Sequence, residues 1–505
     1  MAASSDPSNP SSAYASMSPV WQKIDDIIAG PETIRAGGQS YLPKYEAEED
    51  GEYGRRLAAA PWRPEFVDIL QSLSSKPFGK DVALKQGASA PIKALAENID
   101  ARGNNLTAFA RQVFAKGIAK GMHGVLVEYP KQPTGQTLAD ERQSGARPYW
   151  VSIRAEEVLA LYTAFVQGRE VAVHVRLSES AIERSGFDEV TVQRIRILNR
   201  DPVEADNQIV GFGPPTWQLW EKRGTGEGSS WAMVDEGAYF PQTEIPLVLF
   251  WTGERDGAQF ARPPLEAIAD MQLELYRALS RKDEVLTYTA SPMLQAKGIA
   301  PPDGGALEIG PKRVLFAPPG VDGAETGWSY IQPDAQNLTE IREDVRDLID
   351  DIRRLGMQPL TQKAGNVTAT ASSIEGAKAH SVVEAWALGL KDALEQALVY
   401  TARWLGEASA AEIEIDTDFS VEPYAQAPLD ALAKARENGD LSQGTYWQSL
   451  RRFDVLPPDF DPEAEVKALL QELPGEDTAT DLRDALGRQG DDTVPAEDDT
   501  MEAAA

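Results

Sequence analysis

The 505-residue sequence contains no cysteine. This absence excludes structural disulfides, thiolate metal sites and a cysteine nucleophile, and it fits a reducing compartment best. No apolar run reaches the roughly 20 residues that a membrane-spanning helix needs. Residues 1–16 lack the basic start and the apolar stretch of a signal peptide, so they are predicted to form a disordered tail. We therefore expect an intracellular, soluble protein with several folding units and no membrane contact.

Basic side chains are scarce: 49 Lys and Arg stand against 79 Asp and Glu, a formal net charge of -30. Proteins that grip nucleic acid neutralise phosphates with clustered Lys and Arg, so tight binding of this kind is disfavoured. Loose passage of DNA stays compatible with the composition, because an acidic lining repels phosphate and lets a duplex move. The simpler alternative is that the acidity reflects solubility and an acidic tail.

Histidine is rare too, with His123, His174 and His380 far apart in sequence. None has the spacing of a metal-ligand pair, so all three are predicted to be structural. The glycine-rich run at residues 224–230 is not followed by Lys-Ser or Lys-Thr, and tryptophan-bearing strand patterns flank it. It is therefore predicted to be a hairpin turn rather than a phosphate-binding loop. A G-x-S-x-G nucleophile elbow is also absent.

Adjacent carboxylates are predicted to lie on solvated helix faces or in the acidic C-terminal segment. These pairs are Asp25 and Asp26, Asp350 and Asp351, and Asp491 and Asp492. A two-metal nuclease site is the remote alternative for such pairs. The eleven tryptophans interleave with strand residues or lie on helix stripes, so burial explains them better than ligand stacking. We expect no enzymatic activity, no cofactor and no metal.

The strongest pattern in the chain runs from residue 337 to residue 405. Residues 337–355 place apolar side chains at steps of three and four, which predicts one apolar stripe on a helix. The stripe consists of Leu338, Ile341, Val345, Leu348, Ile349, Ile352 and Leu355. The opposite face is charged, with Glu340, Arg342, Glu343, Asp344, Arg346, Asp347, Asp350, Asp351, Arg353 and Arg354.

A polar segment interrupts this pattern at residues 356–371, where a proline, a glycine and several threonines occur without periodicity, so a loop is predicted. A second helix is then predicted up to residue 405, with Ser372 and Glu375 in capping-box spacing. Its stripe consists of Ile374, Ala377, Ser381, Trp386, Leu390, Leu394, Leu398, Thr401 and Leu405.

The N-terminal half is predicted to be α+β. Short helices are expected at residues 19–29 and 53–73, and a clearer helix at 106–121 leads into a buried strand at 125–129. Alternating or apolar runs then predict strands at residues 149–153, 171–177, 190–198, 216–221, 231–234 and 245–250. Most connections are too short for crossover helices, which favours an antiparallel sheet.

A further helix is predicted at residues 265–286, opened by Pro263 and Pro264 and striped by Leu265, Ile268, Leu275, Leu279 and Leu286. Residues 287–333 contain four short strand-like pieces among turns. After residue 405 we expect a strand at 411–419 and helices at 429–437, 442–453 and 461–473, the second capped by Ser442. Residues from 475 onward are acidic and poor in aromatics, which is typical of a disordered tail.

The order of these parts resembles that of the portal proteins of tailed bacteriophages, over nearly the whole chain. The runs GMHGVLVEYP, RPYWVSIRAEEVLAL, IPLVLF and GDLSQGTYWQSLRRFDVLPPDFDPEAE are similar in style to a prophage group of that family. The resemblance implies a wing at 17–261, stem helices at 262–286 and 337–355, a clip at 287–336, and a tunnel loop at 356–371. It further implies a long helix with a returning wing strand at 372–421, a helical crown at 422–474 and a tail at 475–505.

The resemblance also implies a function. Portals of this family are rings of about twelve identical subunits at one capsid vertex of the virion, assembled in the host cytoplasm, with a channel for DNA packaging and ejection. The implied partners are the terminase large subunit, a head-tail adaptor, the major capsid or scaffold protein, and double-stranded DNA bound without sequence specificity.

Two sets of channel residues follow from the resemblance. The tunnel loop would present Gln358, Thr361, Gln362, Lys363, Asn366 and Thr368 to DNA, and the second stem helix would line the channel with Glu343, Asp347, Asp350, Asp351 and Arg354. The arginines of that helix could pair with acids of the next subunit. Lys363, the only basic residue of the loop, has the alternative role of keeping an exposed loop soluble.

Two other functions remain open from the sequence. The first is a virion, baseplate or scaffold assembly protein without DNA passage. The second is a hydrolase or nuclease with an unrecognised metal site, which would depend on Asp350 and Asp351.

Overall fold

The computed structural model describes residues 6–131, 145–166, 168–205, 208–224, 229–289, 293–297, 326–331, 336–356, 369–417 and 426–452, and a few positions between 455 and 467. The chain divides into two compact units, Met1–Phe419 and Ser420–Ala505. Helices and antiparallel sheets both build the first unit, so the predicted α+β class is confirmed.

The first unit contains, in chain order, α1 (Ser12–Ala29), α2 (Pro31–Ala36), α3 (Asp50–Ala59), α4 (Glu65–Ser75), β1 (Ala83–Leu84), α5 (Ala90–Ala96), α6 (Leu106–Lys120), β2 (Met122–Glu128), β3 (Tyr149–Ile153), β4 (Val158–Val166), β5 (Arg169–Ser185) and β6 (Asp188–Asn199). It continues with β7 (Pro202–Ala205), β8 (Gln208–Phe212), β9 (Thr216–Arg223), β10 (Ser230–Ala238), β11 (Leu247–Trp251), β12 (Glu254–Asp256), β13 (Phe260–Arg262), α8 (Glu266–Thr289), β14 (Met293–Lys297), β15 (Gly327–Ile331), α9 (Gln336–Leu355), α10 (Ala369–Leu405) and β16 (Ile413–Glu414).

The core of the first unit forms around β2. This strand pairs antiparallel with β11 on one side and β3 on the other, and all seven of its residues are buried. The predicted passage from helix into buried strand is confirmed, because α6 ends at Gly121 in a left-handed conformation (φ 83°) and β2 begins one residue later. Both α6 and α10 contact β2. The apolar stripes of these helices therefore meet on this sheet.

A second sheet has five strands in the order β10-β9-β6-β5-β4, with every neighbouring pair antiparallel. This confirms the predicted antiparallel arrangement. The hairpin expected at residues 224–230 is also confirmed, since Arg223 of β9 pairs with Ser230 of β10. Strand β4 was not predicted, because its first four residues are all buried and so show no alternation of apolar and polar side chains.

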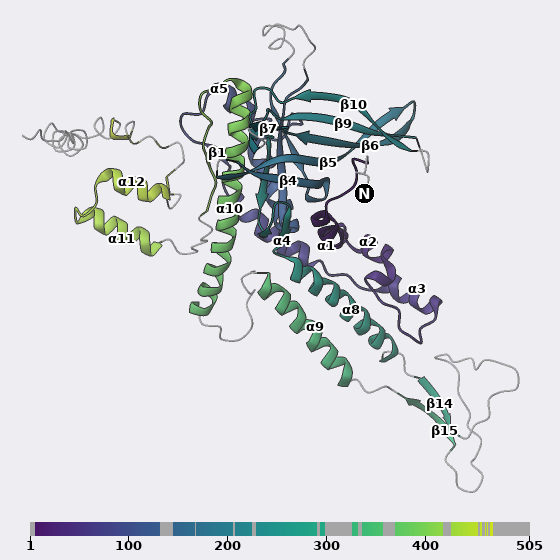
Figure 1. Ribbon diagram of the computed structural model, residues 1–505. Helices are drawn as coiled ribbons and strands as arrows, with labels where there is room; N and C mark the ends of the chain where they lie inside the picture. Colours follow the sequence, from purple (N-terminus) through teal and green to yellow (C-terminus); the bar gives the residue numbers. More distant parts are fainter. Residues whose placement is uncertain are drawn as a thin grey trace, which may run out of the picture. The chain divides into compact units, whose positions relative to one another are not determined.

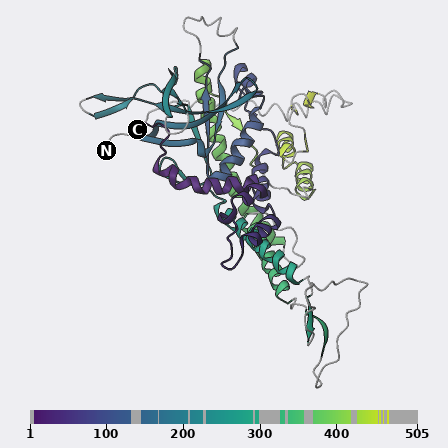
Figure 2. The same ribbon diagram turned by 90° about the vertical axis from the view of Figure 1, so that its right-hand side faces the viewer.

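The segment from α8 to α10 follows the predicted order. Helices α8 and α9 lie side by side and antiparallel, and the strands β14 and β15 between them pair antiparallel (Figures 1 and 2). The other two strand-like pieces predicted here, residues 306–310 and 313–317, lie outside the described residues.

Two helix boundaries differ from the sequence predictions. Helix α1 begins at Ser12, so the tail predicted for residues 1–16 is wrong for the helical residues 12–16. Ser11 caps it by accepting the Tyr14 N–H, and burial of Met17 outweighs the missing N–H of Pro19 inside the helix. Helix α10 begins at Ala369, so the loop predicted up to residue 371 is too long, and the predicted cap Ser372 is inside the helix.

Two leucines assigned to apolar stripes do not belong to the core. Leu286, near the C-terminus of α8, is 43% exposed, and Leu355, the last residue of α9, is 52% exposed. Both lie near the ends of their helices, where the apolar stripe extends beyond the residues that pack against it. The remaining α8 stripe is confirmed, with Leu265, Ile268, Leu275 and Leu279 buried.

The second unit contains α11 (Gln426–Glu437) and α12 (Gln443–Arg452), which contact each other. The predicted cap of α12 is confirmed, because the Ser442 Oγ accepts the Thr445 N–H at 3.2 Å. The predicted helix at 461–473 and the acidic tail fall mostly or wholly outside the described part of the chain. Among the helices that the structure describes, none is both long and apolar enough to cross a membrane.

Candidate functional site

Helix α9 has two faces of opposite character, as predicted. Val345, Ile349 and Ile352 are buried against the core, and Leu338, Ile341 and Leu348 are half-buried. Because α9 contacts α8 and α4, this apolar face is the one that packs within the chain. The charged face is therefore free to meet solvent or another molecule.

The five side chains predicted to line a channel lie on that charged face. Glu343, Asp347, Asp350 and Arg354 follow one another at steps of four, three and four residues, which places them on one side of the helix. Glu343, Asp347 and Arg354 are exposed, and Asp350 and Asp351 are half-buried. Arg354 donates to the Asp351 carboxylate at 2.8 Å. Over the whole charged face, six acids stand against four arginines, so the face is acidic on balance.

The C-terminal end of α9 is fixed to α4 by an ion pair. The Arg353 Nε lies 2.9 Å from the Glu65 Oε2, and Arg63 lies 3.1 Å from the other carboxylate oxygen. The Glu65 side chain is only 5% exposed and Arg353 is 34% exposed. Arg353 was expected to pair with an acid of a neighbouring subunit, but it pairs with Glu65 of the same chain.

A glycine brings the two helices into close contact just after α9. Gly356 is buried, and its N–H donates to the Ile352 carbonyl at 2.8 Å. A Cβ at this position would come within 2.5 Å of the Ile69 Cδ1 and 2.9 Å of its Cγ1 and Cγ2. Only glycine fits here without displacing Ile69.

Helix α10 is anchored to the same unit on the other side of the predicted loop. The Trp386 Nε1 donates to the Thr252 carbonyl at 2.9 Å, and the Trp150 Nε1 donates to the buried Thr401 Oγ1 at 2.9 Å. The predicted stripe is confirmed from Trp386 to Thr401, because Leu390, Leu394 and Leu398 are buried as well.

The segment between α9 and α10 consequently begins at a packed junction, and α10 is packed against the same unit from Val383 onward. Its predicted DNA-facing residues lie outside the described part of the chain and stay predictions: Gln358, Thr361, Gln362, Lys363, Asn366 and Thr368.

The histidines that the structure describes are packing residues. His123 is fully buried in β2 and its Nε2 lies 2.8 Å from the Ser152 Oγ. Burial lowers its pKa to about 3, with Lys116, Lys120 and Arg154 adding to the effect, so the ring is neutral. His174 shares a hydrogen bond with Asn199. His380 belongs to α10, and its side chain lies outside the description.

One carboxylate pair is more than a solvated face, which corrects the prediction. The Asp25 carboxylate accepts from the buried Lys120 at 2.6 Å, and Asp26 accepts from the Tyr41 hydroxyl at 2.5 Å. Burial raises the pKa of Asp25, although Lys120 opposes the shift. Lys120 also pairs with Glu156 at 2.7 Å. These contacts tie α1 to α6 and to the segment between α2 and α3, and they are structural.

Asp350 and Asp351 remain on the charged face of α9 without a third ligand. Across the described residues, no group of three or more His, Asp or Glu side chains could hold a metal ion. Asp350 and Asp351 therefore supply negative charge to this face of α9.

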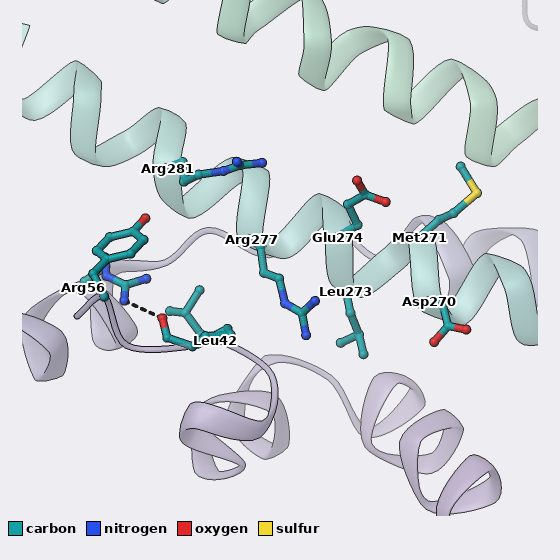
Figure 3. Close-up of a pocket in the computed structure, with 10 residues that line it drawn as sticks. Leu42, Arg56, Asp270, Met271, Leu273, Glu274, Arg277 and Arg281 are labelled. Atoms are coloured by element: carbon teal, nitrogen blue, oxygen red, sulfur yellow. Dashed lines mark hydrogen bonds between the residues drawn. The ribbon is translucent and has the colours of Figure 1, made fainter.

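A hollow that the sequence did not indicate lies between α8 and the segment that joins α2 to α3 (Figure 3). Its volume is about 560 Å³, and Figure 3 shows Leu273 and Arg277 pointing from α8 toward this segment. Its lining combines apolar side chains with arginines and acids: Leu42, Pro43, Tyr45, Arg56, Asp270, Met271, Leu273, Glu274, Arg277 and Arg281. No periodic signal could have found it, because two distant segments form it together.

Comparisons with known proteins give a partial match. Residues 264–405, which extend from just before α8 to the end of α10, match the family described as "Domain of unknown function (DUF4055)". No curated protein matches the sequence.

Three solved structures are similar in fold at low identity. The chain is similar to a chain of the "Neck of empty GTA particle computed with C6 symmetry" (13% identity, 78% of this chain and 91% of that chain, TM-score 0.42). It is also similar to chains of the "Virion of native gene transfer agent (GTA) particle" (12%, 84% and 99%, 0.40) and the "Neck of native GTA particle computed with C12 symmetry" (12%, 78% and 91%, 0.40).

Proposed function

We propose that this chain is the portal protein of a tailed bacteriophage or phage-like particle. In this role it forms a ring at one vertex of the capsid, gives the genome a channel for packaging and ejection, and catalyses no reaction. A terminase motor and a head-tail adaptor would dock on it in turn, and the major capsid or scaffold protein would surround it.

The observation that carries the proposal is that α9 packs one face within the chain and leaves its acidic face free. Helix α9 packs its apolar side on α8 and α4 and keeps Glu343, Asp347 and Asp350 away from that contact. In a ring of identical subunits, each of these acids becomes a belt of negative charge. Such belts repel phosphate, so a duplex can move past them without binding tightly.

The anchoring of α9 and α10 supports the same role. A channel constriction has to keep its position while DNA moves. The segment starts from a packed junction at Arg353 and Gly356, and α10, which follows the segment, is fixed further along at Trp386. Residues 264–405, which match the family model, end at the same residue as α10, Leu405.

Electron microscopy of the purified full-length chain tests the proposal. We expect closed rings with a central hole and a symmetry that can be counted in end views, of about twelve subunits. A monomer, or a particle without a hole, would exclude a portal. A solid or open assembly would instead favour a virion or scaffold component without DNA passage.

A second measurement addresses the nuclease alternative. The chain and its Asp350→Ala and Asp351→Ala variants are incubated with duplex DNA and Mg²⁺ or Mn²⁺. We expect no cleavage by any of the three proteins. Metal-dependent cleavage that is lost in either variant would contradict the proposal.

A further inference from the structure

The hairpin of β5 and β6 extends beyond the sheet that holds it. Strand β4 pairs with β5 only as far as Leu177, and β9 pairs with β6 only from Arg194. Beyond these points, β5 and β6 pair only with each other, up to the pair Ser185 and Asp188. We call residues 178–193 the ribbon. It is a two-stranded projection, and such hairpins are marginally stable in water without further contacts.

The ribbon ends in a fixed turn that exposes an aromatic ring. The two-residue turn consists of Gly186, with a φ of 68°, and Phe187, which is 101% exposed. Positive φ at the first turn position is the geometry that glycine permits in a tight hairpin. The Arg184 Nε donates to the Gly186 carbonyl at 2.7 Å and stabilises the turn. The turn therefore holds Phe187 at the tip of the ribbon, where the described part of its own chain does not bury the ring.

The charges beside this ring are mainly negative. Asp188 and Glu189 follow Phe187 directly, and both are exposed. Val190, 49% exposed, and Ile182, 69% exposed, add apolar surface further from the turn, where they pair with Glu183 and Thr191. The ribbon thus offers an apolar tip with two carboxylates at its base.

The hollow along α8 has the complementary character. Leu42, Pro43 and Leu273 supply apolar walls, and a phenylalanine side chain fits easily within about 560 Å³. The hollow continues along α8 as a second cavity of about 510 Å³, with Tyr45 and Arg56 shared between the two.

The charges of the hollow change sign along α8. Asp270 and Glu274 lie at one end, and Arg277 and Arg281 lie one and two turns further on. Asp270 is paired with Lys23. The Arg277 Nε donates to the Tyr41 carbonyl at 2.8 Å. Arg281 is exposed and makes no ion pair with the residues that the structure describes. The guanidinium groups of Arg277 and Arg281 are thus available to carboxylates.

Arg56, the third arginine of the hollow, is already engaged. It donates to both Glu48 oxygens at 2.7 Å and to the Pro43 carbonyl at 2.9 Å. The basic groups that remain for a ligand are Arg277 and Arg281, which lie between Asp270 and Glu274 on one side and Asp283 and Glu284 of the second cavity on the other.

We infer that the ribbon of one copy of this chain docks in the α8 hollow of a second copy. Phe187 would enter between Leu42 and Leu273, and Asp188 and Glu189 would meet Arg277 and Arg281. The contact joins two different surfaces, so each copy keeps one free ribbon and one free hollow, and repetition builds a closed ring or a filament. This inference rests on the self-assembly in the proposed function and names the contact that would hold neighbouring subunits together.

Oligomer formation by the full-length chain tests the contact. Mass photometry over a concentration series compares the wild type with Phe187→Ala and with Phe165→Ala as the matched control, because Phe165 is an 81% exposed phenylalanine of the same sheet. We expect Phe187→Ala to raise the concentration at half-assembly at least about tenfold, and Phe165→Ala to leave it unchanged. Circular dichroism checks that both variants keep the fold.

Mixing of two variants tests the head-to-tail geometry. Phe187→Ala retains an intact hollow, and Arg277→Glu/Arg281→Glu retains an intact ribbon. At a concentration where the wild type assembles, each variant alone should stay monomeric. An equimolar mixture should form a one-to-one dimer and nothing larger, because only one productive contact remains. A mixture that stays monomeric, or one that forms full rings, would overturn the inference.

A photo-crosslinker in place of Phe187 identifies the docking partner directly. We expect crosslinks between chains to residues 42–45 or 270–281, mapped by mass spectrometry. Crosslinks to other segments, or to another protein in place of a second copy, would overturn the inference. Rings that persist in Phe187→Ala would overturn this contact and leave the portal proposal standing, whereas mapped crosslinks in a particle without a hole would do the reverse.

Discussion

Arg353 at the end of α9 and Glu65 at the start of α4 form an ion pair across 288 residues of sequence, with 2.9 Å between the Arg353 Nε and the Glu65 Oε2. Arg63 adds a second guanidinium to the same carboxylate. One nearly buried acid therefore fixes the end of the acidic helix to the N-terminal helices. The segment that leads away from α9 starts from this fixed point.

We expect Glu65→Ala to destabilise the chain, because it leaves two guanidinium groups beside a buried site without their carboxylate. Removing one partner of a buried pair costs about 3 to 5 kcal/mol, and the partial exposure of Arg353 places the expected loss nearer 2 to 3 kcal/mol. Urea unfolding monitored by tryptophan fluorescence measures the change. The matched control is Arg354→Ala, whose partner Asp351 is half exposed, and we expect less than about 1 kcal/mol for it.

Gly356→Ala should destabilise the same junction through a steric clash. The new Cβ would lie 2.5 Å from the Ile69 Cδ1, and overpacking of this kind costs about 1 to 3 kcal/mol. Differential scanning calorimetry should show a lower Tm. The double variant Gly356→Ala/Ile69→Ala should lose less than the sum of the two single losses, since alanine at position 69 removes Cδ1, Cγ1 and Cγ2 and so relieves the clash.

Gly54→Ala is the control for the effect of replacing glycine itself. Gly54 lies inside α3 and is exposed, and a Cβ added there would have open space within 4 Å. Alanine at this position should stabilise the chain by about 0.5 to 1 kcal/mol, because it restricts the unfolded backbone. A loss of stability in both variants would show that the Ile69 contact is not the cause.

The periodic parts of the candidate site could be predicted from the sequence. The stripe of Val345, Ile349 and Ile352 and the stripe of Leu390, Leu394 and Leu398 repeat at helical spacing, and burial of an apolar face follows directly from it. The charged face of α9 was predictable as well, because the charged residues fall outside the apolar stripe on the helix. Antiparallel pairing of β5, β6 and β9 was also predictable from alternation and short connections.

What periodicity could not supply is the identity of long-range partners. Nothing near Glu65 in the sequence points to Arg353, and Gly356 resembles an ordinary loop glycine until Ile69 is placed beside it. The α8 hollow is hidden for the same reason. The early start of α1 was missed because the sequence does not show that Met17 is buried, and this packing carries the helix through Pro19.

His123 should make stability depend on pH below about 6.5. Its pKa in the folded chain is about 3, below the usual 6.5 of the unfolded chain, so between these values the unfolded state binds one more proton. Stability from this group is fully present above pH 6.5 and falls by about 1.4 kcal/mol per pH unit as the pH drops toward 3. Urea unfolding at a series of pH values measures the slope.

The variant His123→Gln isolates this contribution. Glutamine can keep a hydrogen bond to Ser152 but does not titrate, so the difference in unfolding free energy between wild type and variant should change with pH below 6.5 and become constant above it. Carboxylates titrate in both proteins and cancel in the difference. A pH-independent difference would mean that the folded chain accommodates a charged His123.

Reversing the charge of the free α9 face should convert a repelling surface into one that holds DNA. Glu343 and Asp347 are exposed, so Glu343→Lys/Asp347→Lys should leave the unfolding free energy within about 1 kcal/mol of wild type. Fluorescence anisotropy with a labelled duplex should show tighter binding at about 50 mM salt and a steeper loss of affinity toward about 200 mM, because each new phosphate contact adds about 0.9 to the slope of log K against log salt.

The matched control is Glu97→Lys/Glu204→Lys, which makes the same change of net charge at exposed positions just after α5 and in β7. If the control gains affinity equally, net charge alone governs binding and the α9 face has no special access to DNA. If only the α9 variant gains affinity and only in assembled rings, the acidic face lies where the duplex passes.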